Sequence, residues 1–212
     1  TPFSRRQFVV TAAAAAALPG LAQAAARQHA PDGVFRHGVA SGDPLTDRVS
    51  LWTHAKYLGR TDNVALTYQV ATDNTFAAAS VVASGSVIAT ISTNFTAKVD
   101  ATGLEAGKSY FYRFKAGNTA SSVGKTRTLP ASTATEVKFA VFSCANYPEG
   151  YFNVYGLASQ SDAQYAIHLG DYLYEYQNGY YPAVPTASRI HEPSTEIISL
   201  AEYRTRHAQY KT

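Results

Sequence analysis

Short runs of alternating hydrophobic and polar residues, separated by turn residues, fill the sequence from residue 34 to about residue 133. A period of two is typical of strands with one buried face, so the pattern predicts a small β-sandwich without helices. Turn residues at 118–122 predict a hairpin tip, and Leu-Pro-Ala-Ser at 129–132 is typical of a linker. The predicted strands are residues 48–53, 65–71, 80–88, 95–101, 110–116 and 122–128.

The strand predicted over residues 110–116 has the clearest alternation. Its period of two places Tyr110, Tyr112 and Phe114 on one face, which we expect in the core, and Phe111 and Arg113 on the other. Residues 104–113 resemble the late loop and strand of fibronectin type III sandwiches, including a tyrosine placed to form a tyrosine corner. The resemblance implies a fibronectin type III-like domain, which we expect over residues 33–134.

The pattern changes after the linker. Residues 137–142 form a nearly continuous apolar run, as expected for a strand covered on both faces. A helical stretch at 152–159 and a second apolar run at 165–169 would complete a βαβ unit. We therefore expect residues 135–212 to be the first part of an α/β domain.

Residues 1–26 have the features of an export signal. A positively charged start contains Arg5 and Arg6, an Ala-rich apolar stretch covers residues 9–21, and a small-residue cleavage site follows at 22–24. The Ser-Arg-Arg-x-Phe string resembles the twin-arginine consensus, which implies contact with that translocon and a folded product in the periplasm or outside the cell. The alternative is an Ala-rich helix that merely begins with two arginines.

Charge and composition narrow the classes of partner. The net charge is +3, of which Arg5 and Arg6 supply two, so the remainder of the chain gives no reason to expect a nucleic-acid partner. No later apolar run is long enough to cross a membrane, and we expect a water-soluble monomer. A single cysteine cannot form an intramolecular disulfide, which leaves it free, paired with another molecule or bound to a metal.

The candidate chemistry lies just after the two apolar strands. Cys144 follows the first strand and Asp171 follows the second, so both would reach the same edge of a parallel sheet. Gly170 allows a tight turn, and the Asp171 carboxylate has two oxygens that can bridge two cations. Taken singly, each residue has an ordinary interpretation: a Gly-Asp turn, a buried cysteine and, for Tyr174, a packing tyrosine.

Several motifs together are more specific. They are Phe-Ser-Cys at 142–144 with Asn-Tyr at 146–147, His-Leu-Gly-Asp-Tyr-Leu-Tyr-Glu at 168–175, Phe-Arg-His-Gly-Val-Ala-Ser-Gly-Asp-Pro at 35–44, Arg-Val-Ser-Leu-Trp-Thr at 48–53, and the helical segment 199–211. In this order they resemble the amino-terminal portion of the PhoD family of alkaline phosphatases and phosphodiesterases, within the metallophosphoesterase superfamily.

This resemblance implies a metal-dependent hydrolase of phosphate monoesters or diesters. By it, Cys144, Asp171 and Tyr174 take metal-ligand positions: Fe(III) held by the thiolate and the phenolate, with Asp171 bridging to Ca(II). A trivalent cation favours such anionic ligands. A metal-bound hydroxide would then attack phosphorus directly, with no phosphoenzyme.

Other polar residues have simpler interpretations. We expect His29, His37, His54, His191 and His207 to be structural or solvated rather than metal ligands. Glu202, Arg204 and Arg206, on one short helix, are expected to form a solvated face.

The resemblance breaks off before the family's downstream Trp-Asp-Asp-His-Glu-like stretch, and the chain contains no methionine. We therefore expect it to be a portion of a larger enzyme and to be inactive alone. One alternative is a secreted sandwich that binds a partner without catalysis, if Thr212 is the true carboxyl terminus. Another is a purple acid phosphatase, whose first strand usually ends in Asp where this one ends in Cys144.

Overall fold

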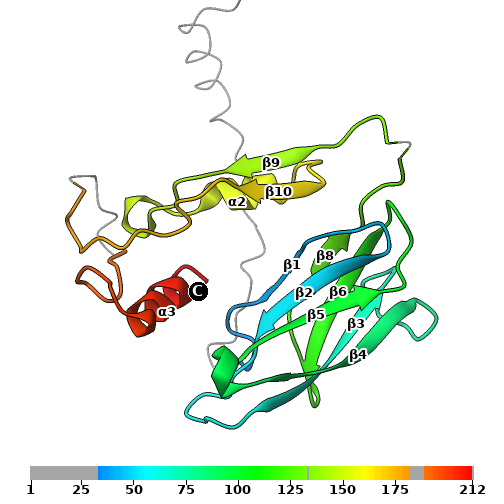
Figure 1. The fold of residues 1–212 in the computed structure, drawn as a ribbon, viewed down its shortest axis with the longest axis horizontal. Coiled ribbons are helices and arrows are strands. Elements are labelled where there is room, and N and C mark those ends of the chain that lie inside the picture. Colours follow the sequence, from blue (N-terminus) through cyan, green and yellow to red (C-terminus); the bar gives the residue numbers. More distant parts are fainter. Residues whose placement is uncertain (1–32, 133, 182–188, 212) are drawn as a thin grey trace, which may run out of the picture.

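The computed structural model describes residues 33–132, 134–181 and 189–211, so the predicted export signal lies outside the described residues. Most of its regular structure is β-strand, arranged first as two antiparallel sheets (Figure 1). One sheet contains β1 (Val39–Gly42), β2 (Arg48–His54) and β5 (Thr96–Thr102), in that order. The other contains β4 (Val81–Ala89), β3 (Val64–Ala71), β6 (Ser109–Ala116) and β7 (Thr119–Ala120), with β8 (Gly124–Arg127) also paired to β6. A 3-10 turn, η1 (Ile91–Thr93), leads into β5.

The two sheets enclose one hydrophobic core. Leu51 from β2, together with Val70 from β3 and Phe114 from β6, is completely buried. Tyr110 and Tyr112 are also buried, so the predicted inward face of this strand is confirmed. Removal of these apolar side chains from water is the main favourable contribution to folding of this two-sheet unit, residues 39–127.

A tyrosine at the start of β6 fastens the preceding loop to the sheet. The Glu105 main-chain N–H donates to Tyr110 Oη at 2.9 Å, which is the contact of a tyrosine corner. From the other side, Thr128 Oγ1 donates to the Glu105 carbonyl at 2.6 Å and accepts from the Lys108 N–H at 3.1 Å. The loop before β6 is therefore tied both to β6 and to the residue after β8.

All six predicted strands are present, with bounds that differ by a residue or two, and two short strands were not predicted. β1 pairs with β2, and β7 lies within the segment predicted as a hairpin tip. The last strand, β8, is shorter than predicted. Before it, the Ser121 Oγ accepts from the Phe114 N–H at 2.9 Å and donates to the Ser122 carbonyl at 2.8 Å, in addition to the Ser121 N–H bond to the Phe114 carbonyl at 2.8 Å.

The second part contains the predicted βαβ unit. Strand β9 (Phe139–Phe142) runs parallel to β10 (Tyr165–His168), and the connection between them holds η2 (Tyr147–Glu149) and α2 (Asn153–Ala158). After a long loop, α3 (Leu200–Gln209) begins with a capping box between Ser199 and Glu202. Within the part of the chain that the structure describes, no helix is long and apolar enough to cross a bilayer.

The expectation that both apolar strands are covered on both faces is wrong for the described residues. Phe139 is 52% exposed, Val141 57% and Leu169 70%. The physical reason is that β9 and β10 form a sheet of two strands, with no further strand of the described chain beside them. Large apolar side chains of this sheet are therefore exposed to solvent, without another element of the described chain packed on them.

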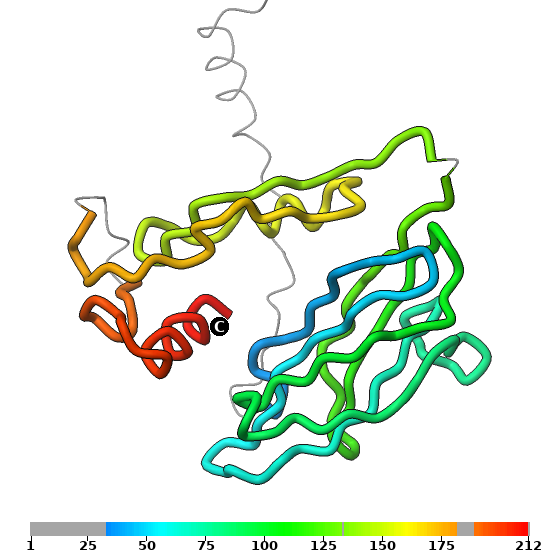
Figure 2. The backbone as a smooth tube through the Cα atoms, viewed as in Figure 1, coloured from blue at the N-terminus to red at the C-terminus, as the bar shows by residue number. Residues whose placement is uncertain are grey.

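The two-sheet unit and the part of the chain that follows it contact each other at two places. Near the linker, Tyr165 Oη donates to the Thr128 carbonyl at 3.0 Å. At the other end, the last residues of the chain return to the start of β1 (Figure 2), where Tyr210 and Lys211 line one cavity with His37. The βαβ unit and α3 are thus held against the edge of the two-sheet unit.

Candidate functional site

Three of the side chains singled out from the sequence meet at one oxygen atom. The Cys144 thiol donates to Asp171 Oδ2 at 3.3 Å, and the Tyr174 hydroxyl donates to the same oxygen at 3.2 Å. Cys144 lies two residues after β9 and Asp171 three residues after β10, so the parallel pairing of these strands brings both to one sheet edge. The structure therefore brings together all three candidate ligands.

The backbone at this edge has unusual dihedral angles. Cys144 has a φ of 58° and Asp171 a φ of 50°, in the left-handed region that non-glycine residues seldom adopt. Two hydrogen bonds hold the pair: the Cys144 N–H donates to the Gly170 carbonyl at 3.2 Å and the Ala145 N–H to the Asp171 carbonyl at 2.8 Å. Such conformations persist where the surroundings enforce them, and they cluster at functional sites.

The electrostatics of the cluster favour a bound cation. The pKa of the Tyr174 phenol is raised above its ordinary value, first by desolvation, then by its hydrogen bond with Cys144 and by the negative charge of Asp171. The phenol therefore holds its proton more firmly than an ordinary tyrosine does, and a cation that compensates the phenolate charge would act against this shift. A thiol, a carboxylate and a phenol are the donor set that a multivalent cation deprotonates and holds, so these residues fit the implied metal.

Among the described residues, no three His, Cys, Asp or Glu side chains gather into a metal-binding group. The cluster has only two residues of those types, Cys144 and Asp171, and its third donor is the phenol of Tyr174.

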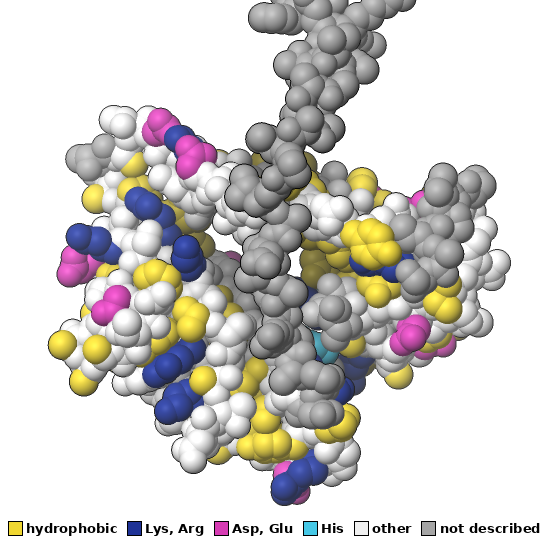
Figure 3. Space-filling model, turned by 180° about the vertical axis from the view of Figure 1, so that it is seen from behind, with side chains coloured by type: hydrophobic (Ala, Val, Ile, Leu, Met, Phe, Trp, Pro, Cys, Tyr) yellow, Lys and Arg dark blue, Asp and Glu magenta, His cyan; other side chains and the backbone are white. Residues whose placement is uncertain are grey.

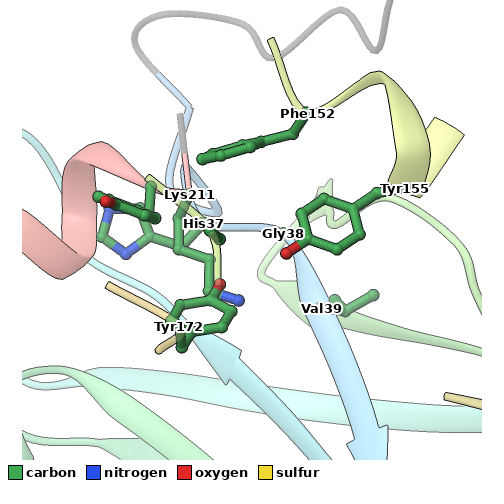
Figure 4. Close-up of a pocket in the computed structure, with 9 residues that line it drawn as sticks. His37, Gly38, Val39, Phe152, Tyr155, Tyr172 and Lys211 are labelled. Carbon is green, nitrogen blue, oxygen red and sulfur yellow. The ribbon is translucent and has the colours of Figure 1, made fainter. Parts of the chain in front are cut away.

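Two hollows adjoin this region. An open pocket of about 550 Å³ lies beside Cys144, lined by the end of β9 and by α2, with Asn146, Glu149 and Tyr151 at its wall. A smaller cavity of about 200 Å³ lies between the start of β1 and the second part of the chain. Figure 4 shows Phe152 and Tyr155 on one side of it, opposite His37 and Tyr172.

Four of the five histidines considered as ligands lie in the described residues. His37 stacks on His54 with ring centroids 4.4 Å apart, and burial lowers the pKa of His37 to about 4. His191 is buried, and His207 packs against an aromatic ring. The interpretation of these histidines as structural or solvated rather than as metal ligands stays a prediction, and His29 lies outside the described residues.

Arg206 contradicts the expectation of a solvated face. Arg204 is exposed as expected, but the Arg206 side chain is fully buried. It donates five hydrogen bonds to main-chain carbonyl oxygens, those of Tyr174 (2.6 Å), Tyr176 (3.3 Å), Glu192 (3.2 Å), Pro193 (2.7 Å) and Thr195 (3.2 Å). Arg206 and the buried Tyr210 lie four residues apart and share the inward face of α3, whereas the residue pattern of this short polar helix gave no sign that an arginine would be buried.

His168, which lies in one of the motifs but was given no role of its own, is placed beside the cluster. Its Nε2 lies 3.3 Å from Tyr155 Oη, and its Nδ1 accepts from the Gly170 N–H at 3.4 Å. His168 therefore contacts the backbone of the turn that carries Asp171. Its place at the end of an apolar strand, two residues before Gly170, was the available signal.

Comparison with known proteins gives consistent matches over both parts of the chain. Residues 20–130 match the PhoD-like phosphatase N-terminal domain and residues 139–212 match the PhoD-like phosphatase family. Alkaline phosphatase D of Bacillus subtilis (strain 168) is 41% identical over 186 residues, which are 84% of this chain and 31% of that protein. The solved structure of PhoD superposes with a TM-score of 0.75 at 38% identity, covering 85% of this chain and 36% of that chain. The chain thus spans about a third of the length of these relatives.

The buried His191 predicts a loss of stability at acid pH. Neither ring nitrogen has a hydrogen-bond partner, and burial lowers its pKa from 6.5 to about 4. As the pH falls from 6.5 to 4, the unfolded chain takes up a proton at this position that the folded chain does not, so the folded state loses stability, by at most about 3 kcal/mol.

His191→Phe, which keeps a ring beside Tyr210, should flatten this dependence when the free energy of unfolding is measured by urea titration at pH 7.5 and pH 4.5. Parallel pH profiles for the variant and the wild type would rule out His191 as the source.

Proposed function

The chain belongs to the PhoD-like phosphatase family, and from this we propose that the protein is an exported, metal-dependent hydrolase of phosphate monoesters or diesters. We propose Cys144, Asp171 and Tyr174 as its metal ligands. The observation that carries the proposal is the meeting of a thiol and a phenol on one Asp171 oxygen at the carboxyl ends of two parallel strands. Few functions other than cation binding use these three groups together.

The proposed cations are Fe(III), held by Cys144 and Tyr174, and Ca(II), to which Asp171 would bridge. When bound, the two cations would supply positive charge for the substrate phosphate and Lewis-acid activation of the attacking water. In their absence the Cys144 and Tyr174 protons bridge to Asp171 Oδ2. Loss of these two protons would free that carboxylate oxygen for a cation, which couples metal uptake to proton release.

The protein's own residues also suggest where the rest of a substrate lies. The open pocket beside Cys144 is walled by Tyr151, Phe152 and Tyr155, with the polar groups of Asn146 and Glu149 among them. Aromatic walls with a few polar groups are typical of sites that receive an organic ligand. We place the ester group of the substrate there, with its phosphate at the cluster.

We further propose a fibronectin type III-like domain over residues 33–134 and the start of the catalytic domain over residues 135–212. The tyrosine corner at Tyr110 supports the first, and the parallel β9–β10 pair supports the second. Two metal ions need more than three protein ligands. The exposed apolar faces of β9 and β10 suit a surface that further sheet and helices of the complete enzyme would cover.

Export through the twin-arginine translocon is the proposed route, and the periplasm or the exterior is the proposed location. A nucleic-acid partner is not proposed. On the face shown in Figure 3, the Lys and Arg side chains of the described residues are interspersed with hydrophobic and acidic ones.

Export should depend on both arginines of the signal. The conservative change of Arg5 and Arg6 together to lysine keeps the charge but removes the paired guanidinium groups that the translocon receptor reads. We expect the double variant to remain in the cytoplasm when cell fractions are assayed by immunoblot. Arg27→Lys, which lies beyond the signal, is the matched control. Equal export of the wild type, the double variant and Arg27→Lys would exclude this route.

Tyr174 should give the iron-loaded complete protein a visible absorption band. A phenolate and a thiolate on Fe(III) produce ligand-to-metal charge transfer, so Tyr174→Phe should lose or shift the band. Tyr176→Phe is the matched control, because the Tyr176 ring stacks on that of Tyr174 in the same loop, whereas the hydroxyl that donates to Asp171 is that of Tyr174. An unchanged spectrum in Tyr174→Phe removes Tyr174 from the ligand set.

The 212-residue chain alone should not hydrolyse p-nitrophenyl phosphate or bis-p-nitrophenyl phosphate, even with iron and calcium. The complete protein should hydrolyse at least one of them, and Asp171→Asn should reduce that turnover by at least a hundredfold because the bridging charge is lost. Asp162→Asn, at an exposed ion pair with Lys138, is the control. No turnover by the complete protein would favour the binding-module alternative, and Asp171-dependent turnover by the 212-residue chain would contradict the prediction that this chain is inactive alone.

A further inference from the structure

Arg206 is a buried cation whose hydrogen-bond donors are all used. A guanidinium has five N–H donors, and Arg206 makes five hydrogen bonds: one from Nε, two from Nη1 and two from Nη2. Every acceptor is a main-chain carbonyl oxygen, and none of its contacts in the described part of the chain is a carboxylate. Burial of a charge is costly unless its hydrogen bonds are satisfied, so this residue fixes the geometry of whatever it contacts.

The carbonyls belong to two separate segments of the long loop between β10 and α3. Nη1 contacts Tyr174 at 2.6 Å and Tyr176 at 3.3 Å, in the loop that follows Asp171. The other two nitrogens contact the segment 192–195, before α3. The rigid planar fork of arginine can hold both segments at once, and the shorter, single-headed lysine cannot.

Further hydrogen bonds join the same two segments. The Ile197 N–H donates to the Glu175 carbonyl at 2.9 Å, and the Asn178 N–H donates to the Ser194 carbonyl at 2.9 Å. The Asn178 side chain also pairs with both main-chain groups of His191. The segment that contains Tyr174 is therefore held to the segment before α3 both by these hydrogen bonds and by the Arg206 guanidinium.

From these contacts we propose that Arg206 is a positioning residue for Tyr174: it holds the Tyr174 main chain so that the phenol reaches Asp171. The shortest of its bonds with the loop is to the carbonyl of Tyr174 itself, and the hydroxyl of that residue meets Asp171 Oδ2. The proposal rests on the metal-binding role proposed for Tyr174. Groups that orient a ligand in this way typically change metal affinity by 10- to 100-fold when they are removed.

The test compares Arg206→Lys with Arg204→Lys in the complete protein. Arg204 lies on the exposed face of the same helix, so its replacement controls for loss of an arginine from α3. Iron titration followed by visible absorption should show roughly 10- to 100-fold weaker binding and a shifted band for Arg206→Lys, and no change for Arg204→Lys. Hydrogen exchange of the metal-free protein should be faster for Arg206→Lys at residues 172–178 and 190–197 than elsewhere.

Two results would overturn the proposal. In the first, Arg206→Lys binds iron and exchanges its amide hydrogens as the wild type does. In the second, exchange in Arg206→Lys is faster to the same extent over the two-sheet unit as over the two loop segments. If Arg206→Lys does not fold, native-state exchange of the wild type decides. The Asn178 and Ile197 amides should exchange together with the amides of α3, and exchange of these two amides well before α3 contradicts the proposal. If the wild-type protein shows no iron band while Arg206→Lys changes exchange locally, the metal-binding proposal fails, and the role of Arg206 in holding the Tyr174 main chain stands.

Discussion

The parallel ladder between β9 and β10 is the constraint on which the candidate site depends. Its register places Phe142 opposite His168, so that the residues just beyond each strand, Cys144 and Asp171, emerge at one edge. Two further main-chain bonds across that edge hold both residues in left-handed conformations. Without this pairing, a thiol and a carboxylate 27 residues apart would have no reason to meet.

The site is completed by side chains from outside the ladder. Tyr174 comes from the loop after Asp171, and its hydroxyl reaches the same carboxylate oxygen as the thiol. That loop is not held by β10 alone, since Arg206 on α3 bonds to its main chain. The cluster proposed as a metal site thus joins a strand edge to a loop that is bonded to a helix about 30 residues downstream.

The two-sheet unit has a hydrophobic core of its own. Its apolar side chains are enclosed between its own sheets, whereas β9 and β10 leave large apolar side chains exposed. The contrast has a thermodynamic meaning, because exposed apolar surface of this kind contributes little to stability until another element covers it. The chain's span of about a third of its relatives agrees with this uneven burial.

The sequence alone determined the features that depend on order along the chain. Period-two alternation located six strands, including the inward face of Tyr110, Tyr112 and Phe114, and the placement of Cys144 and Asp171 after apolar runs predicted their meeting. Both signals are local, so a short window of sequence contains them.

Only the tertiary structure decided which charged and polar groups are buried and which apolar faces are not. Arg206 on a short polar helix had every sign of a solvated residue, and it is buried because five carbonyls from two segments of the preceding long loop surround it. The strands at 137–142 and 165–169 had every sign of full burial, and several of their large apolar side chains remain exposed because no further strand lies beside them in the described chain. Burial is a property of the segments that meet in space, and a local pattern of residues does not contain it.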